Sequence, residues 1–280
     1  MNTEAVGDLL AYLNQREFAD GGGDSPLYAD RERIHARYAG RRLDTLFQPI
    51  VDLDEGDAIG HEGLLRVHTP GGTLAPEIMF QQRADIACIT YLDRLARTLH
   101  ALNFLVLELR GALHLNVHPH HLLAVSADHG HVFEGILRQC GLAPEQIVLE
   151  VAEHAVREKQ RLRHAIAAWQ AKGYRIAIDN FGRGHSQIAR VLNLAPDIIK
   201  LDRRLLPAAE HHPRSRQPLA ELSIRAGVRD IRVIATGIET AAQLALVREL
   251  RFGLGQGFLL GVPAADGNAA PAPRFTSFAG

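Results

Sequence analysis

Several short apolar runs of this chain end in a polar residue whose side chain could take part in chemistry. Six residues occupy such positions, namely Asn116, Glu150, Asp179, Lys200, Thr236 and Gln256, and Glu62 lies in a further apolar run. Carboxylate and amide oxygens are the donors that hard divalent cations such as Mg2+ or Mn2+ prefer. Inward-facing carboxylates without a cation repel one another, although a lysine offsets part of that charge. The pattern therefore leaves two interpretations open: a divalent-cation site, and a salt-bridge network with a purely structural role.

Strand and helix patterns alternate along the chain and determine where these residues would lie. Strands are expected at 46–53 and 58–67, with a hairpin turn at 54–57, and then at 113–117, 147–151, 175–178, 198–201, 231–235 and 253–258. A helix is expected to begin at Pro76 and to present Phe80, Ala84, Ala87, Leu92, Leu95 and Leu99 on its apolar face. Later helices are expected at 131–140, 157–172, 186–193, 216–227 and 240–250.

This alternation predicts an α/β protein whose parallel strands are joined by helical crossovers. About eight strands favour a closed (β/α)8 barrel of the TIM type over an open sheet. No Gly-x-Gly-x-x-Gly turn follows the first strand, which also argues against a dinucleotide-binding sheet. In such a barrel the carboxyl ends of the strands meet at one mouth, so the polar residues would line one pocket.

The two ends of the chain differ from the barrel pattern. Residues 1–40 are expected to form a partly helical extension, with an amphipathic helix at 4–17. The barrel domain is expected to cover residues 41–263. Residues 264–280 are rich in Ala, Pro and Gly without periodicity, which predicts a flexible tail.

Composition narrows the classes of partner and compartment. The net charge of −1 gives no reason to expect nucleic acid or an anionic membrane surface as a partner. No apolar run reaches the roughly 20 residues of a membrane-spanning helix, and the acidic start of the chain is unlike a signal peptide. Cys88 and Cys140 match no metal or redox spacing. A reduced, cytoplasmic location is therefore expected.

Beyond this alternation of strands and helices, the chain resembles the EAL domain, the family of cyclic di-GMP phosphodiesterases and their catalytically degenerate relatives. The resemblance runs from about Phe47 to Pro263 and implies a TIM-type barrel with an antiparallel strand near its start. It is carried, in order, by Phe-Gln-Pro-Ile-Val-Asp-Leu (47–53), Gly-His-Glu-Gly-Leu-Leu-Arg (60–66), Asn116, Val-Leu-Glu-Val-Ala-Glu (148–153), Ala-Ile-Asp-Asn-Phe-Gly (177–182), Lys-Leu-Asp (200–202), Ala-Thr-Gly-Ile-Glu-Thr (235–240) and Gln-Gly-Phe (256–258). The naming motif reads Glu-Gly-Leu here, with Gly63 in place of the usual alanine.

The resemblance implies a role for each matching position. Metal ligands would be Glu62, Asn116, Glu150 and Asp179, with Asn180 at a further ligand position. Lys200 would orient or activate the attacking water, acting with Glu62 and Asp179 as the catalytic group. Arg66 would hold a ligand phosphate, since an Arg fork suits phosphate oxygens. The other implied ligand contacts are Gln48, Leu64, Pro76, Asp202 and Gln256.

Two departures from the family pattern predict an impaired site. Asn180 stands where a second acidic residue is usual, and Thr236 stands where the family has glutamate. Three of five expected carboxylates therefore remain, and repulsion between two dications would be poorly offset. We expect one Mg2+ or Mn2+ site rather than two. Arg183, in the loop after Asp179, would contact a ligand phosphate or point to solvent.

Three functions follow from the resemblance. We favour a degenerate phosphodiesterase that binds cyclic di-GMP as a receptor or effector and acts on a protein partner. The first alternative is an active, metal-dependent phosphodiesterase that produces linear pGpG, so the sequence leaves open whether the chain is an enzyme. The second alternative is a protein-interaction module without ligand. Members of the family commonly pair, so a homodimer is a further expectation.

Three other features have structural explanations beside the functional ones. The histidines at 118, 120 and 121, with His114 nearby, could bind zinc, but a loop and helix start is the favoured interpretation. Trp169 lies at helical spacing with Leu162 and Ile166, which predicts core packing. Glu153 would brace the loop at 181–186, or serve as a carboxylate at a helix start.

Overall fold

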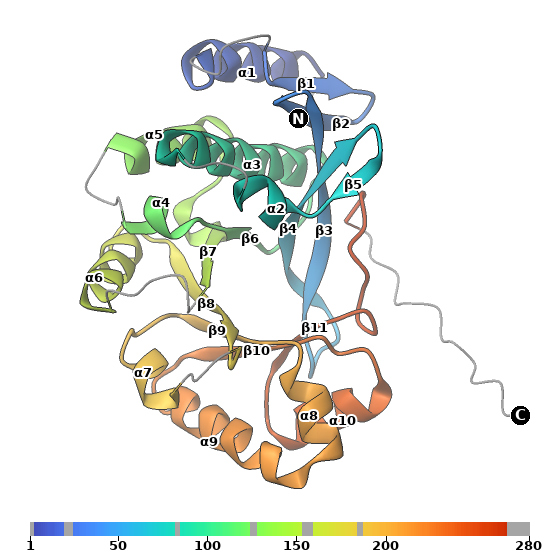
Figure 1. Ribbon diagram of the computed structural model, residues 1–280, viewed down its shortest axis with the longest axis vertical. Helices are drawn as coiled ribbons and strands as arrows, with labels where there is room; N and C mark the ends of the chain where they lie inside the picture. The colour runs from blue at the N-terminus through green and yellow to red at the C-terminus, as the bar shows by residue number, and fades with distance from the viewer. Residues whose placement is uncertain are drawn as a thin grey trace, which may run out of the picture.

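The strands of the described residues close into a barrel of eight, and Figure 1 shows these strands with the helices arranged around them. The computed structural model describes residues 3–19, 25–81, 85–123, 128–152, 159–183 and 187–267. In order around the ring, the barrel strands are β3 (Arg41–Asp52), β11 (Leu254–Gln256), β10 (Arg232–Thr236), β9 (Ile198–Leu201), β8 (Arg175–Phe181), β7 (Ile147–Ala152), β6 (Ala112–Asn116) and β4 (Ala58–Thr69). β3 runs antiparallel to both of its neighbours, and the remaining barrel pairings are parallel. The predicted barrel and its antiparallel strand are confirmed.

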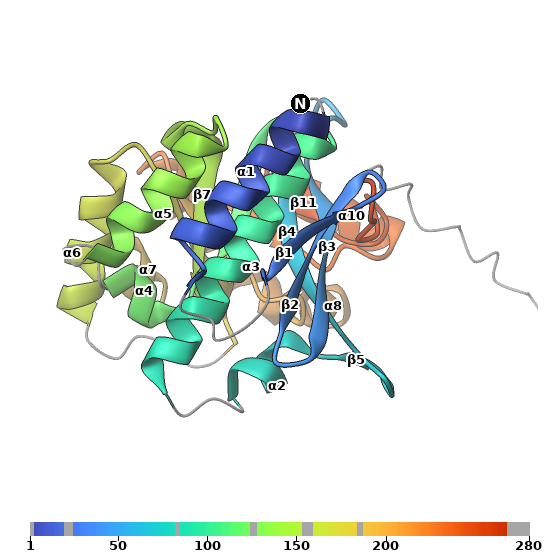
Figure 2. The ribbon, with the colours of Figure 1, turned by 90° about the horizontal axis from the view of Figure 1, so that it is seen from above.

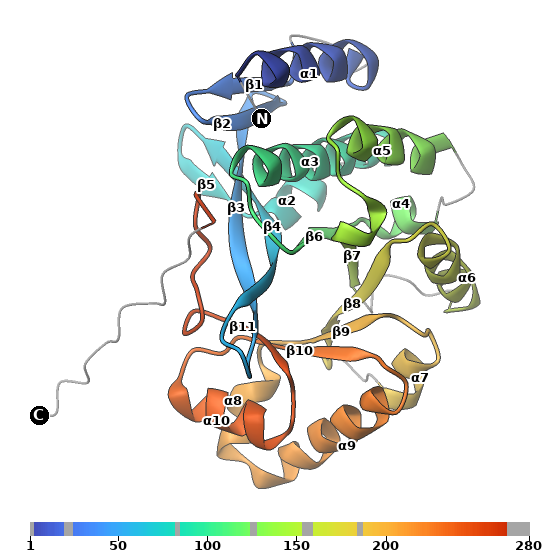
Figure 3. The same cartoon turned by 180° about the vertical axis from the view of Figure 1, so that it is seen from behind.

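Helices surround the barrel on its outer side, which Figure 3 shows from behind. They are α3 (Ile86–Val106), α4 (Pro119–Leu123), α5 (Asp128–Gln139), α6 (Lys159–Gln170), α7 (Ile188–Leu192), α8 (Leu205–His211), α9 (Arg216–Gly227) and α10 (Ala241–Glu249). Thr240 caps the start of α10, because its hydroxyl accepts the N–H of Gln243 and the Gln243 side chain accepts the N–H of Thr240. None of the helices in the described ranges has the length and apolar character needed to cross a membrane.

The apolar residues form two layers of core. One lies inside the barrel and consists of Ile50, Ala112, Val148, Ala177, Ile198, Ile234 and Leu254. The larger layer lies between the strands and the helices and includes Trp169, which is fully buried and donates from Nε1 to the carbonyl of Leu122 at 3.0 Å. The prediction that Trp169 serves core packing is confirmed. Because the inner layer fills the barrel interior, a ligand would bind at the barrel mouth.

β3 and β4 extend past the barrel and form an arm together with shorter strands. β1 (Leu27–Asp30) and β2 (Arg33–Tyr38) pair on the β3 side of the arm, and β5 (Gly72–Leu74) pairs with β4. α1 (Thr3–Arg16) packs against β1, and α3 packs against β2 (Figure 2). The helix predicted at 4–17 is confirmed, whereas the β1–β2 hairpin was not predicted. The proposed domain boundary at residue 41 stays a prediction, and it falls where β2 is hydrogen-bonded to β3.

Two further segments differ from the sequence expectations. The single helix expected from Pro76 is two helices, α2 (Pro76–Gln81) and α3, because Asp85 caps a new helix by accepting the N–H of Ala87 at 3.1 Å. Residues 82–84, between them, lie outside the described ranges. In the expected tail, Ala264 exchanges two backbone hydrogen bonds with Phe47, at 2.8 and 2.9 Å. Residues 268–280 lie outside the described ranges.

Candidate functional site

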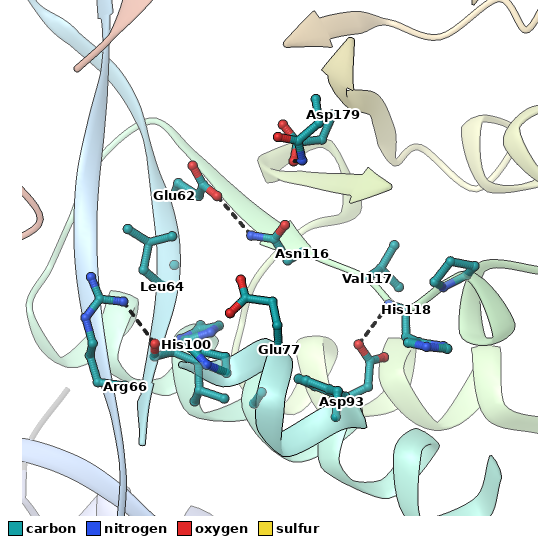
Figure 4. Close-up of a pocket in the computed structure, with 17 residues that line it drawn as sticks. Glu62, Leu64, Arg66, Glu77, Asp93, His100, Asn116, Val117, His118 and Asp179 are labelled. Atoms are coloured by element: carbon teal, nitrogen blue, oxygen red, sulfur yellow. Dashed lines mark hydrogen bonds between the residues drawn. The ribbon is translucent and has the colours of Figure 1, made fainter. Parts of the chain in front are cut away.

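The barrel brings the carboxyl ends of its parallel strands together, and the predicted polar residues with them. The register pairs Asn116 with Glu150 across β6 and β7, and Thr236 with Gln256 across β10 and β11. Glu62 lies on β4, beside His114 of β6. Figure 4 shows Glu62, Asn116 and Asp179 directed toward one another from three strands. Glu62, Asn116 and Asp179 thus lie together at the mouth of the barrel, and their functional roles stay predictions.

Lys200 lies at the centre of a buried hydrogen-bond network. Its Nζ donates to Glu62 Oε2 at 2.8 Å and to Glu150 Oε2 at 2.6 Å. Gln256 Nε2 donates to Glu62 Oε2 at 2.8 Å, and Asn116 Nδ2 donates to Glu62 Oε1 at 2.9 Å. One ammonium group thus holds two carboxylates that are almost fully enclosed by protein.

The two carboxylates that share Lys200 are not equivalent. Burial opposes ionisation of both, but Lys200 and the amide donors of Gln256 and Asn116 lower the pKa of Glu62 to about 2. Glu150 is closer to Lys200, yet burial and the charge of Glu62 raise its pKa to about 8. Burial likewise raises the pKa of Asp179 to about 6, against the attraction of Lys200. The donors around Glu62 thus favour its ionised form, whereas burial and the neighbouring Glu62 charge favour the protonated form of Glu150.

Replacing Glu150 by Gln should change how stability depends on pH. The folded-state pKa of Glu150 is raised to about 8, above its ordinary value of 4.5, so it makes the wild-type free energy of unfolding fall as pH rises between those values. Glu150→Gln removes that proton exchange. The variant is therefore expected to gain stability relative to wild type, on the order of 2 kcal/mol between pH 5 and pH 8.

Chemical denaturation in EDTA at pH 5, 6.5 and 8 measures this difference. Parallel pH profiles for wild type and Glu150→Gln would show that the Glu150 carboxyl is ionised throughout. The idea that Glu62 and Glu150 titrate separately would then be abandoned.

The side chains at the two degenerate positions are engaged in local hydrogen bonds. Asn180 lies at a break in the β8–β9 register with a positive φ of 57°, and its Nδ2 donates to Asp179 Oδ2. Asparagine and aspartate tolerate this left-handed backbone better than most residues. The hydroxyl of Thr236 donates to the carbonyl oxygen of Leu201. Neither side chain contributes a negative charge to the mouth.

A cavity of about 420 Å³ opens beside this network (Figure 4). Among the predicted site residues, it is lined by Glu62, Leu64, Arg66, Pro76, Asn116, Asp179 and Asn180. Three predicted ligand contacts are absent from its lining, and each has a protein partner. Gln48 donates to the carbonyl of Gly261 at 3.1 Å, Asp202 accepts from Arg204 Nε at 2.7 Å, and Gln256 donates to Glu62. Their roles in ligand binding stay predictions.

The cavity and its network also include residues to which the sequence gave no role at the barrel mouth. His114 Nδ1 lies 2.7 Å from Glu150 Oε1 and is buried with it. His100 and Asp93 line the cavity from α3, and Asp93 Oδ1 accepts the backbone N–H of His118 at 2.9 Å. The period of two in a strand was a usable signal for His114, because it places His114 on the same face as Asn116. His100 and Asp93 lie on a helix and had no comparable signal.

Buried Asp93 also forms an ion pair with Arg97, one turn further along α3. Arg97 Nε and Nη2 donate to Asp93 Oδ2 at 3.1 and 2.8 Å, and the guanidinium lies 4.0 Å from the ring centroid of Phe133. Asp93 thus joins α3 to the segment that follows Asn116. This contact fixes the cavity wall below the strand end.

The oxygen donors at the mouth suit one hard cation in their chemistry. Glu62, Asn116, Glu150 and Asp179 supply carboxylate and amide oxygens only. Within the described ranges, however, no three His, Cys, Asp or Glu side chains converge into a group that could hold a metal ion. Lys200 instead lies between two of the donors, so a cation would have to take its place there.

The remaining predicted features lie at the edge of the described site. Arg183 is exposed, and its carbonyl accepts from Arg204 Nη2 at 3.4 Å. Glu153 and residues 184–186 lie outside the described ranges. In the described part of the chain, His114, His118 and His121 belong to no group of side chains that could hold a metal ion, and the His118 ring stacks on Phe80 at 6.3 Å between centroids. The side chain of His120 is outside the described set.

Comparisons with known proteins agree with the fold and the motifs. The family model of the EAL domain matches residues 31–263. Escherichia coli PdeB, named a probable cyclic di-GMP phosphodiesterase, is 24% identical over 83% of this chain and 45% of that protein. The cyclic di-GMP phosphodiesterase NbdA of Pseudomonas aeruginosa is 29% identical over 79% of this chain and 29% of its own length. This chain spans less than half the length of either relative.

Among solved structures, BlrP1 of Klebsiella pneumoniae superposes with a TM-score of 0.74 at 25% identity. The match covers 96% of this chain and 69% of that one, and the structure is a complex with calcium and cyclic di-GMP. The family match covers most of the chain and includes all eight strands of the barrel. This chain therefore belongs to the EAL domain family.

Proposed function

We propose that this domain binds cyclic di-GMP in the cavity at the barrel mouth and acts as a receptor, with its phosphodiester hydrolysis impaired. The relatives named above support the ligand, because two of them are named for it and one was solved with it. Asn180 and Thr236 support impaired hydrolysis, because both side chains are uncharged and donate hydrogen bonds to neighbouring protein oxygens. That second observation carries the proposal, since it separates this chain from an intact two-metal hydrolase.

Arg66 is the proposed phosphate-binding group. Its Nη1 donates to the carbonyl of Leu65 at 3.0 Å, which fixes the guanidinium beside the cavity and leaves other N–H donors for a ligand. Leu64 and Pro76 provide apolar surface on the same side. Phe80 and His118, stacked at one wall, provide an aromatic surface suited to a nucleobase. The cavity therefore combines a cationic fork with flat apolar walls, as a nucleotide requires.

The same residues would give only partial catalytic machinery. A single Mg2+ or Mn2+, held by Glu62, Asn116, Glu150 and Asp179, would polarise a phosphoryl oxygen or a bound water. Lys200 would orient the water together with Glu62 and Asp179. Thr236 places no carboxylate at the mouth, and Asn180 contributes an amide in place of a charge. Residual hydrolysis is thus the alternative function, and the retention of Glu62, Asn116, Glu150, Asp179 and Lys200 favours it.

Receptor function also implies a macromolecule that responds to occupancy. A protein partner, or a second copy of this chain, is proposed for that role. A domain without ligand, serving only as an interaction module, is the remaining alternative. Direct measurement of nucleotide binding separates it from the other two.

Replacing Arg66 by Ala should weaken binding of cyclic di-GMP by about 10- to 100-fold. A charge-assisted hydrogen bond to phosphate contributes about 1.5–3 kcal/mol, and the variant removes the only guanidinium that lines the described part of the cavity. Isothermal titration calorimetry with purified protein, in EDTA and again with Mn2+, measures the dissociation constant.

Arg42→Ala is the matched control for this measurement. Arg42 lies on β3 of the same arm, pairs with Asp44 at 3.0 Å and does not line the cavity. Its removal should leave the dissociation constant unchanged. Equal affinities of Arg66→Ala and wild type would place the ligand elsewhere. A wild-type protein that binds no cyclic di-GMP would leave the interaction module as the surviving function.

A further inference from the structure

We propose that Gly63 and His100 form an interlocked pair that sets the position of the Glu62–Arg66 segment beside the cavity. Gly63 departs from the alanine that gives the EAL family its name. In this proposal His100 requires glycine at position 63. That requirement is independent of the carboxylates that are missing at Asn180 and Thr236. Only the last step, the effect on nucleotide binding, rests on the proposed function.

The first observation is steric. A Cβ atom added at Gly63 would lie 2.8 Å from Cγ, 2.9 Å from Cβ and 3.1 Å from Cδ2 of His100. Contacts below 3.0 Å to the base of a buried side chain cannot be relieved by moving a flexible tip, because these atoms are held by α3. Gly63 has an ordinary strand conformation, so its backbone would accept alanine. His100 therefore gives a steric reason for glycine at position 63.

The second observation is that His100 is fixed in place. Its Nδ1 is hydrogen-bonded to Thr45 Oγ1 at 2.8 Å, and Thr45 is fully buried on β3. Burial lowers the pKa of His100 to about 3, so the ring is neutral and behaves as a polar packing group. The imidazole therefore joins α3 to β3 while it lies against β4. It cannot turn away from Gly63 without breaking the bond to Thr45.

The third observation is the place of this contact in the site. Gly63 lies between Glu62, which binds Lys200, and Leu64, which lines the cavity. Side chains alternate along β4, so Glu62, Leu64 and Arg66 share one face while Gly63 meets the helix on the other. Both His100 and Asp93 come from α3 and line the cavity. The distance between β4 and α3 therefore sets how Arg66 and Glu62 face the ligand, and the glycine–imidazole contact sets that distance.

A double-mutant cycle tests the interlock. Gly63→Ala should lower the melting temperature by about 5 °C, because overpacking of a tight contact is destabilising. His100→Ala should also lower it, by opening a cavity and leaving Thr45 without its partner. In the double variant the new methyl group occupies part of the space that the ring has left. Its melting temperature should therefore fall by clearly less than the sum of the two single effects.

Binding of cyclic di-GMP, measured well below every melting temperature, tests the positioning role. Gly63→Ala should weaken the dissociation constant about tenfold, and the double variant should recover part of that loss. Gly253→Ala is the matched control, since a Cβ there would meet nothing within 4 Å. It should change neither the melting temperature nor the affinity by a measurable amount.

Each outcome decides one part of the proposal. Additive single effects on the melting temperature would overturn the interlock. A coupled melting temperature with unchanged affinity in Gly63→Ala would reduce the pair to core packing and overturn its positioning role. If wild type binds no cyclic di-GMP, the proposed function fails, while the melting-temperature cycle still judges the interlock.

Discussion

Asn180→Asp combined with Thr236→Glu is expected to raise hydrolysis of cyclic di-GMP by about a thousandfold over wild type. The two changes restore the carboxylates at the positions where the family pattern has them. Asp179 would gain a charged neighbour, and the left-handed backbone at residue 180 accepts aspartate as it accepts asparagine. A thousandfold change corresponds to a barrier lower by about 4 kcal/mol, which is within the contribution of a catalytic divalent cation.

A single-turnover assay measures this gain directly. Protein in excess over labelled cyclic di-GMP is incubated with Mn2+, and cyclic and linear nucleotide are separated by chromatography. Wild type is expected to leave the cyclic dinucleotide intact over hours. Asn180→Asp with Thr236→Gln is the matched control, because glutamine has the size of glutamate without its charge.

The same assay can also contradict the explanation that Asn180 and Thr236 cause the impaired hydrolysis. A restored double variant as inactive as wild type would show that the impairment lies elsewhere, for example in the Gly63–His100 contact. Linear product from wild type, abolished by Glu62→Ala, would show that three carboxylates suffice. The receptor proposal would then give way to the active phosphodiesterase.

The sequence predicted the barrel and its mouth because the strand signals and the polar residues coincide. Val-Leu-Glu and Ile-Ile-Lys each end an apolar run in one charged residue. In a parallel barrel all such ends meet, so Glu150 and Lys200 could be placed together without any contact being known. The topology of the fold therefore brings polar residues that are distant in the sequence together at one barrel mouth.

The β1–β2 hairpin escaped prediction because its turn lacks the usual residues. Ile34 and Ala36 alternate with polar side chains, as a strand requires. The turn, however, is formed by Arg31 and Glu32, with Arg31 at a φ of 54°, where a glycine or asparagine is expected. Without that signal, a short alternating run inside a charged stretch resembles an irregular extension. The separate start of α3 was hidden for a related reason, since the apolar spacing continues past its cap at Asp85.

The contacts that shape the cavity depend on packing between distant elements. His100 meets Gly63 only because α3 lies against β4, and the pKa values of Glu62 and Glu150 differ only because their neighbours differ. In the sequence, Gly63 is only a replacement of the alanine in the family motif. The three-dimensional contact makes it a matched partner of a histidine, which no local pattern could indicate.

Lys200→Met is expected to lower the free energy of unfolding by about 3–5 kcal/mol near pH 7, and the melting temperature by about 10 °C. The side chain of Lys200 is almost completely buried, and its removal leaves Glu62 ionised beside Glu150 without a cation. The folded-state pKa of Lys200 is raised, so its contribution is fully present at neutral pH. Thermal unfolding in EDTA measures the loss.

The Lys200→Met effect should shrink as the pH is lowered toward 5. Without Lys200 the pKa of Glu62 rises, so Glu62 can take up a proton there and remove the buried charge that the variant leaves without a cation. Lys172→Met is the matched control, because Lys172 lies 2.6 Å from Glu134, the same distance that separates Lys200 from Glu150, but its side chain is 28% exposed. That surface pair should contribute about 1 kcal/mol or less. Similar losses of unfolding free energy in the two variants would mean that burial does not strengthen the ion pairs of Lys200. The site would then be open enough for a cation to replace the lysine at little cost.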